Sequence, residues 1–372
     1  MTTPVEFSGD FSPGGDFTLG VEDELLLLDA SNRLEPSRSD HLVETVRAAT
    51  RDRPGTASQE LFAAQIEFST GICADAERAV EQLASMRSAL AAAGGRALAS
   101  GLHPAAPLGE AALSHGAHYD QVGHDLAGLL RTPTAALQVH VGLPDERAAL
   151  VAYRGIRNRL AVLQALSAAS PYWHGRDSGM ASARWAVISS YPRGGVPPLV
   201  RTWEEYAALA GATAAAACTD DPSMVWWDAR LRPKLGTIEI RVMDAQPRLA
   251  VIAGLAALVQ GLVRHEVENS GGIDVPSPVL AENNFRVARH GLDTTITDLE
   301  GSHRAVRDLA RTALRDARAV LSPDGLGGAL EVIEELLAGT PEYARQREVH
   351  ASLGTSGLVA DLVERTEVRV VS

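Results

Sequence analysis

The 372-residue sequence contains a single lysine, Lys234, so nearly all of its fixed positive charge is carried by arginine. A phosphate-binding loop of the form G-x-x-x-x-G-K-[ST] needs a lysine beside its last glycine, and no such segment is present. A catalytic lysine nucleophile is nearly excluded for the same reason. If this protein binds phosphate groups, we expect arginine or a metal ion to hold them.

Cysteine is also scarce, and the charge is of the opposite sign to that of nucleic-acid-binding proteins. Cys73 and Cys218 cannot form a disulfide framework and lack metal-ligand spacing, which indicates a reducing compartment. The net charge of -13 argues against nucleic acid or an anionic membrane as a partner. We therefore expect small-molecule partners.

Long hydrophobic runs and targeting segments are absent as well. The first residues, "MTTPVEFSGDFSPGG", lack the basic and apolar regions of a secretory signal, so we expect a cytoplasmic protein. The longest apolar run, "LAVIAGLAALVQGLV" from Leu249, is short for a membrane span and predicts a buried helix. With no repeat and no long linker, we expect one domain over residues 1–372, mostly helical from about residue 301.

What the sequence does contain is a set of short strands that carry carboxylates. In "TLGVEDELLLLD" three acids stand directly before four leucines, although burying unpaired carboxylates is costly. Because side chains alternate along a strand, residues two apart share a face about 7 Å apart. Four segments then have a polar face: Glu22 and Glu24; Gln65 and Glu67; Gln138 and His140; Thr237, Glu239 and Arg241.

Alternation of this kind also occurs in sheets that face solvent, but the residue types favour a functional face. Solvent-facing positions usually mix Thr, Lys, Ser and Arg, whereas these are mainly glutamates with one histidine and one arginine. Clustered carboxylates stay ionised only beside a cation, and Mg2+ or Mn2+ would leave open positions for phosphate oxygens. The pattern predicts a metal-dependent enzyme that uses ATP, with Arg241 contacting the terminal phosphate.

Six ordered segments make the chain resemble a known family. They are "LGVEDELLLLD", "SQELFAAQIEFSTGIC", "LQVHVGLPD", "ALSAASPYWHGRDSGMASARW", "VWWDARLRPKLGTIEIRVMDAQP" and "ENNFRVARHGLD". From about Phe17 to Glu367, the sequence resembles the type 2 glutamate–cysteine ligases, also called carboxylate–amine ligases. The resemblance implies an α+β, glutamine-synthetase-like fold. Its curved, mostly antiparallel sheet would hold ATP and two or three Mg2+ (or Mn2+) ions on the concave face, with helices on the convex side.

The resemblance also implies a reaction and its residues. ATP would activate a carboxylate as an acyl phosphate, and an amine would then attack to give an amide, as in joining glutamate to cysteine. A homo-oligomer is implied too. The implied metal ligands are Glu22, Glu24, Glu60, Glu67, His140 and Glu239. The implied catalytic residues are Arg241, Arg184 and Glu67; those at the nucleotide are Arg241, Asn284 and Arg230; those at the substrate are Gln65, Arg184 and Ser182.

Three departures from the family pattern do not remove an implied ligand. Asp23 replaces the middle glutamate of the first motif, but it points to the opposite face of the strand. Gln138 replaces the first histidine of a His-x-His motif and leaves His140 in place. Phe285 stands where tryptophan is common. We therefore expect an active enzyme.

Several interpretations remain open at this stage. Glu60 could be a plain surface acid, and Asp177 could form a structural ion pair with Arg184 instead of a substrate wall. The segment "SHGAHYDQVGH" invites a zinc site, but its glycines and the lack of nearby cysteine favour a solvated loop. The aromatic residues that could stack a nucleobase or simply fill the core are Tyr172, Trp173, Trp185, Trp226 and Trp227.

Two other functions fit the same acidic face. A guanidino or carboxylate kinase on a related fold would stop at phosphoryl transfer and need no amine. A nucleotide-binding regulator would not turn over at all, although it would have little use for a complete set of metal ligands. The identity of the acid and of the amine is left open.

Overall fold

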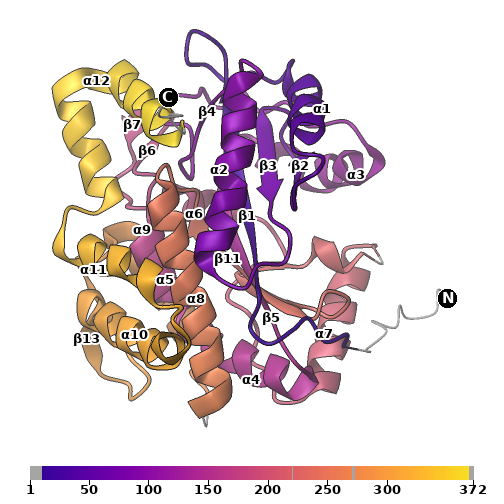
Figure 1. Ribbon diagram of the computed structural model, residues 1–372, viewed down its shortest axis with the longest axis vertical. Coiled ribbons are helices and arrows are strands. Elements are labelled where there is room, and N and C mark those ends of the chain that lie inside the picture. Colours follow the sequence, from indigo (N-terminus) through magenta and orange to yellow (C-terminus); the bar gives the residue numbers. More distant parts are fainter. Residues whose placement is uncertain (1–10, 220, 270–272, 368–372) are drawn as a thin grey trace.

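The computed structural model describes residues 11–219, 221–269 and 273–367 of the chain (Figure 1). In these residues one large sheet has the strand order β10-β11-β5-β1-β3-β2, with β4 paired to β1, and every neighbouring pair is antiparallel. Its strands are β1 (Leu19–Leu28), β2 (Thr56–Gln59), β3 (Gln65–Ser69), β4 (Arg96–Leu98), β5 (Ala136–Gly142), β10 (Ala229–Arg232) and β11 (Thr237–Asp244). The predicted antiparallel sheet is confirmed.

One face of this sheet is apolar and carries the helices. Leu25, Ile66, Val139 and Ile240, one from each of four strands, are fully buried on this face. Among the helices that pack on the strands of this sheet are α2 (Ala76–Ala92), α4 (Glu146–Arg157), α5 (Leu160–Ser167) and α8 (Leu249–Asn269). In Figure 1, α2 and α8 lie across the strands, as expected for helices that cover one face. The opposite face is left for the site.

The predicted buried helix is α8, and it is longer than the apolar run that signalled it. By length and composition its 21 residues could cross a membrane. However, 72% of an 18-residue apolar stretch within this helix is buried inside the fold. It packs against α2, α4 and α10 (Val306–Leu321). Its buried amide, Gln260, donates hydrogen bonds to the carbonyl oxygens of Phe17 and Ala74, at 2.8 and 2.9 Å. It is a core helix.

The remaining helices surround this centre. They are α1 (Ser39–Ala49), α3 (Ala117–Leu126), α6 (Ala183–Ile188), α7 (Trp203–Ala216), α9 (Ser277–His290), α11 (Glu331–Ala338) and α12 (Glu342–Thr366). The short strand pairs are β6 (Tyr172–Trp173) with β7 (Arg176–Asp177), β8 (Gly194–Gly195) with β9 (Trp226–Trp227), and β12 (Thr295–Thr297) with β13 (His303–Ala305). In the described residues after 301 the chain is mostly helical, apart from β13.

Some helix boundaries differ from the sequence pattern for local reasons. The apolar periodicity of residues 76–99 predicts a helix over that range, but the chain is helical only to Ala92, because Gly94 adopts a positive φ of 70° and the chain turns into β4.

The sequence predicts Asp145, behind Pro144, as the N-cap of a helix running to about Ser167, and the Asp145 carboxylate does accept a hydrogen bond from the Ala148 amide at 2.7 Å. That stretch is divided into two helices, α4 and α5. Thr202 caps α7 in the same way as Asp145 caps α4.

Asp23 ties the sheet to the C-terminal part of the chain. It points away from Glu22 and Glu24, as expected, and is fully buried. Arg87 of α2 donates to both oxygens of Asp23, at 2.8 and 2.9 Å. The same guanidinium donates to the carbonyl oxygens of Gln246, Pro247 and Thr366, the last residue of α12. One buried ion pair therefore links β1, α2 and α12.

Candidate functional site

The predicted polar residues gather on the face of the sheet opposite α2 and α8. Strand register sets them directly across from one another: Glu24 opposite Glu67, Glu22 opposite Gln138, His140 opposite Glu239, and Glu239 opposite Arg230. Directly opposed residues on antiparallel strands share a face. The four alternating segments thus form one continuous polar surface.

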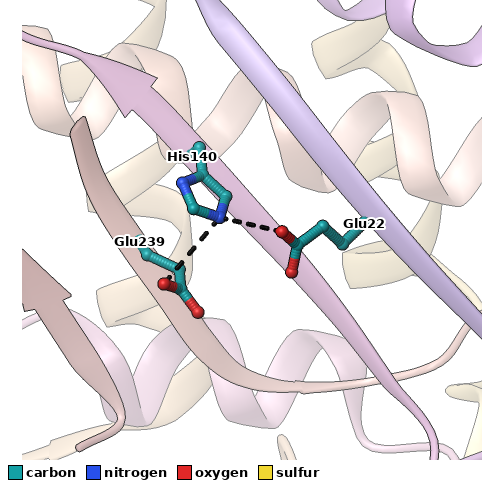
Figure 2. A group of neighbouring side chains, drawn as sticks. All are labelled: Glu22, His140 and Glu239. Atoms are coloured by element: carbon teal, nitrogen blue, oxygen red, sulfur yellow. Dashed lines mark ion pairs between the residues drawn. The ribbon is translucent and has the colours of Figure 1, made fainter. Parts of the chain in front are cut away.

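The first acidic group on this surface is centred on His140 (Figure 2). Its Nε2 lies 3.2 Å from Glu22 Oε1 and 3.8 Å from Glu239 Oε2. This Nε2 atom is buried and forms no hydrogen bond of ordinary geometry. The other ring nitrogen, Nδ1, is 3.0 Å from the Thr237 hydroxyl, which fixes the ring. Ligand atoms of the three residues lie within 4.8 Å of one another, so the group fits a divalent cation.

Arginines surround the Glu239 end of this group. Arg230 donates to both oxygens of Glu239, at 2.8 and 3.0 Å, and Arg241 also contacts that carboxylate. Burial alone would raise the pKa of Glu239, but the charges of Arg241 and Arg230 hold it well below the usual range. Burial likewise opposes ionisation of Glu22, yet the adjacent His140 lowers its pKa. Both acids are therefore ionised and ready to bind a cation.

The second acidic group is formed by Glu24, Glu60 and Glu67, whose ligand atoms also lie within 4.8 Å of one another. Burial and the charge of Glu67 raise the pKa of Glu24 to about 7. Burial and the charge of Glu24 raise the pKa of Glu60 to about 7 as well. Burial, followed by the charges of Glu22 and Glu60, raises the pKa of Glu67 well above its usual range. Three buried carboxyl groups this close together retain protons until a cation replaces them.

A β-bulge aims Arg241 into the space between the two groups. The pairing of β11 with β5 shifts register between Ile240 and Met243, so Arg241 and Val242 together face Gln138. Bulges re-aim side chains and occur often beside active sites. Here the Arg241 guanidinium contacts both Gln138 and Glu239. The pattern of alternating residues predicts its face, but not this bulge.

The polar face forms one end of a cavity of about 320 Å³. This polar end is lined by Glu22, Glu24, Glu60, Gln65, Glu67, Gln138, Arg184, Asp228, Arg230, Arg232 and Arg241. The remaining wall is mostly apolar. Size and composition suit a small-molecule site.

The structure brings most of the predicted site residues into this cavity, but not all. Gln65 and Arg184 line it. Ser182 and Asn284 do not line it: the Ser182 hydroxyl donates to Asp244 at 2.9 Å, and the Asn284 amide donates to Asp228 at 3.1 Å. Ser182 also caps α6. These two residues therefore support the wall from behind.

Asp228 is a cavity residue that the sequence did not single out. It is 4% exposed and follows the two tryptophans of β9. The available signal in the sequence is a lone acid directly after two tryptophans. Of those aromatic candidates, Trp185 and Trp226 line the cavity, whereas Tyr172, Trp173 and Trp227 do not.

Two sequence interpretations are corrected. From Ala117 on, the histidine-rich segment belongs to the helix α3 and is not a loop; His118 of this helix lines the cavity and lies 3.7 Å from Asp221. In the described part of the chain, neither group able to hold a metal includes His115, His118 or His124. Asp177 does not pair with Arg184. It binds Arg347 at 2.8 Å, because Arg184 lies inside the fold beside Asp244.

Comparison with known proteins identifies close relatives. Residues 18–347 match glutamate–cysteine ligase family 2. A Rubrobacter xylanophilus protein, provisionally named glutamate–cysteine ligase 2-1, is 33% identical over 373 residues, covering 98% of this chain and 97% of the relative. A Sorangium cellulosum protein, provisionally named glutamate–cysteine ligase 2, is 31% identical over 371 residues, covering 95% and 97%.

Solved structures show the same fold. Glutamate–cysteine ligase of Francisella tularensis, in complex with AMP, superposes with a TM-score of 0.70 at 13% identity, covering 96% of this chain and 89% of that one. A bifunctional glutathione synthetase from Pasteurella multocida gives 0.63 at 13% identity, covering 94% and 52%. The predicted fold class is thus confirmed. By sequence match and by relatives that span nearly its whole length, the chain belongs to glutamate–cysteine ligase family 2.

Proposed function

We propose that this protein is an ATP-dependent carboxylate–amine ligase that joins the side-chain carboxylate of an amino acid such as glutamate to an amine. The observation that carries the proposal is the pair of acidic groups on one sheet face, with Arg241 between them, in a chain of this family. A phosphoryl donor needs cations and an arginine close together at one point, and this face supplies both kinds of group.

The residues present fit bound metal ions. Glu22, His140 and Glu239 would hold one ion, and Glu24, Glu60 and Glu67 would hold one or two more. Carboxylate-rich sites of this kind suit Mg2+ or Mn2+, and such ions neutralise phosphate charge during transfer. The buried Nε2 of His140 supports this assignment, because it faces the carboxylates of Glu22 and Glu239 without a hydrogen bond of ordinary geometry.

The chain's own side chains then have distinct roles. Arg241 would contact the terminal phosphate of ATP as the acceptor carboxylate attacks it to form an acyl phosphate. Arg184 and Gln65, both in the cavity wall, would hold the acid in line. Attack by the amine would release phosphate and leave an amide. A second cavity, of about 260 Å³, shares Glu22 with the first, is also lined by His140 and would receive the rest of the nucleotide.

The remaining expectations belong to the same proposal. The protein would act in the cytoplasm on small molecules, as one structural unit and as a homo-oligomer, without nucleic acid or membrane. A kinase on this face is the second candidate, since phosphoryl transfer alone needs the same groups. A regulator that binds nucleotide without turnover is the third.

The test is ADP release with Mg2+ and ATP over a panel of carboxylates, beginning with L-glutamate, each with and without hydroxylamine. Hydroxylamine is a small nucleophile that traps an acyl phosphate as a hydroxamate. We expect hydroxamate and ADP in equal amounts with one acid. ADP without hydroxamate would favour the kinase, and nucleotide binding with no ADP across the panel would favour the regulator.

A further inference from the structure

Three arginines converge on the single carboxylate of Glu239. Arg230 and Arg232, two residues apart on β10, share a face of that strand, and both line the cavity. Arg230 donates to both oxygens of Glu239, and Arg241 contacts the same carboxylate. Arg232 Nη1 also donates to its Oε2, at 3.2 Å. One negative charge therefore faces three positive ones and cannot neutralise them all.

Arg230 is almost fully engaged by the fold. Its Nε and Nη2 donate to Glu239, and its Nη1 donates to the carbonyl oxygens of Ser223 and Val225, at 2.7 and 2.6 Å. Its side chain is only 6% exposed. All three nitrogens of this guanidinium are thus used to hold Glu239 and a loop. We therefore expect a structural role for Arg230, which the resemblance implies at the nucleotide.

Arg232 is the opposite case. Among the described residues only its Nη1 has a partner, so Nε and Nη2 keep donors for a ligand. A third of its side chain, 33%, is exposed. Asp221, another acid on this side, already accepts from the Ser223 amide at 2.8 Å and lies 3.7 Å from His118. Arg232 therefore presents a partly free guanidinium to the cavity.

The strand register places Arg232 where the two cavities meet. It is directly opposite Thr237 in the β10–β11 ladder, and the Thr237 hydroxyl lies 3.0 Å from His140 Nδ1. Thr237 and His140 line the second cavity, whereas Arg232 lines the first. A nucleotide that lies in the second cavity and reaches Arg241 with its terminal phosphate passes this point with its other phosphates.

We propose that Arg232 binds the phosphates of the nucleotide that lie between its base and its terminal phosphate, and that Arg230 does not. This inference rests on the proposed function and adds a residue to its nucleotide site. Arginine suits the role because its planar guanidinium carries a fixed charge and can donate two hydrogen bonds to one phosphate. With Arg241 at the terminal phosphate, the phosphates would be held at two points.

Binding of ADP with Mg2+ can be measured by calorimetry in the whole protein without turnover, with adenosine as the probe that lacks phosphates. Arg232→Met removes the charge but keeps a long side chain. We expect it to weaken ADP about 10-fold or more, the usual effect of losing a charged hydrogen bond, and to leave adenosine within about 2-fold. Arg232→Lys should recover part of the loss, because it keeps the charge. Unchanged ADP binding in Arg232→Met, or an equal loss with adenosine, would overturn the proposal.

Two further variants separate this role from a structural one. Lys234→Met removes a positive charge two residues further on, from an exposed side chain that lines neither cavity, and should change neither binding constant. Arg230→Met should lower the melting temperature, because it leaves Glu239 and two carbonyl oxygens short of donors, whereas Arg232→Met should nearly preserve it. An equal fall for both arginine variants would overturn the proposal by assigning Arg232 to the fold.

Turnover distinguishes failure of this inference from failure of the proposed function. In the hydroxylamine assay, Arg232→Met should raise the KM for ATP about 10-fold or more and leave the KM for the acid within about 2-fold. An equal rise in both values would contradict the assignment to the nucleotide. Absence of hydroxamate from a wild-type protein that binds ADP would overturn the ligase but not this inference. A wild-type protein that binds no ADP would overturn both.

Discussion

Two adjacent acids of β1 have opposite roles, and the difference follows from the strand's alternation. Glu22 faces His140 in the cavity, whereas Asp23 is buried against Arg87 on the apolar side. Alternation predicts the two faces, and the structure confirms them. The partner of Asp23 could not be predicted, because it comes from a helix 64 residues away in the sequence.

Substitution of these neighbours should therefore separate activity from stability. Glu22→Gln should lower turnover on the order of 100-fold or more, a loss that even outer partners of metal ligands can produce. Its melting temperature should be nearly unchanged. Asp23→Asn should lower the free energy of unfolding by about 3 to 5 kcal/mol, since it leaves the Arg87 charge buried and unpaired. Steady-state ADP release and chemical denaturation measure the two effects; a large loss of stability in Glu22→Gln would contradict the assignment.

The second acidic group makes the metal-free protein sensitive to pH. The pKa values of Glu24 and Glu60 are about 7 in the folded chain, above the ordinary value of 4.5. Folding thus favours their protonated forms, so stability from this source is fully present below about pH 4.5 and is lost as pH rises to about 7. In EDTA, the melting temperature should fall between pH 5 and pH 8.

Mg2+ should largely remove that fall, because it binds the folded state and replaces the protons. Glu24→Gln should flatten the pH profile in EDTA and weaken the response to Mg2+. A profile in EDTA that is flat for the wild-type protein would show that the three carboxylates are not compressed as the structure indicates.

At the scale of whole elements, the close contact of α8 with α10 depends on a glycine. A Cβ added at Gly261 would lie 2.6 Å from the Ala317 Cβ and 2.8 Å from its Cα, whereas one at Gly254 meets nothing nearer than 3.2 Å. Overpacking of this kind costs about 1 to 3 kcal/mol, against a gain of about 1 kcal/mol from the helix preference of alanine.

Gly261→Ala should therefore lower the melting temperature, and by more than Gly254→Ala in the same helix. Thermal denaturation of both variants measures the difference. Equal behaviour would mean that α8 and α10 can separate at little cost.

Helices and strands could be predicted where the sequence has a strong periodicity or a clear N-cap. They could not be predicted where contacts between residues far apart in the sequence determine the local structure. The strand faces, the start of α2 at Ala76, and the N-caps Asp145 of α4 and Thr202 of α7 were visible in the sequence. Helix α3 was not, because its glycines and histidines resemble a loop, and only its packing over the cavity shows the use of Val122 and Leu126. The bulge at Arg241 was also hidden, since register depends on the partner strand.

At the scale of the molecule, one apolar core runs from the sheet into the C-terminal helices, with Leu358 and Leu362 of α12 in the same cluster as Leu25 of β1. We expect a single unfolding transition. The five tryptophans lie between residues 173 and 227, so their fluorescence reports the middle of the chain, whereas circular dichroism reports helices throughout. Coincident curves would support one cooperative unit, and separate midpoints would contradict it.

The solitary lysine has a practical consequence. Lys234 is exposed in the tight turn between β10 and β11, next to Arg232, which lines the cavity. Apart from the α-amine of the chain, an amine-reactive fluorophore would attach at this one side chain, without any engineered cysteine. Because the turn continues directly into the strands that carry Arg230 and Glu239, the dye would report ligand arrival as a change in brightness. The natural protein thus contains its own labelling position for binding kinetics.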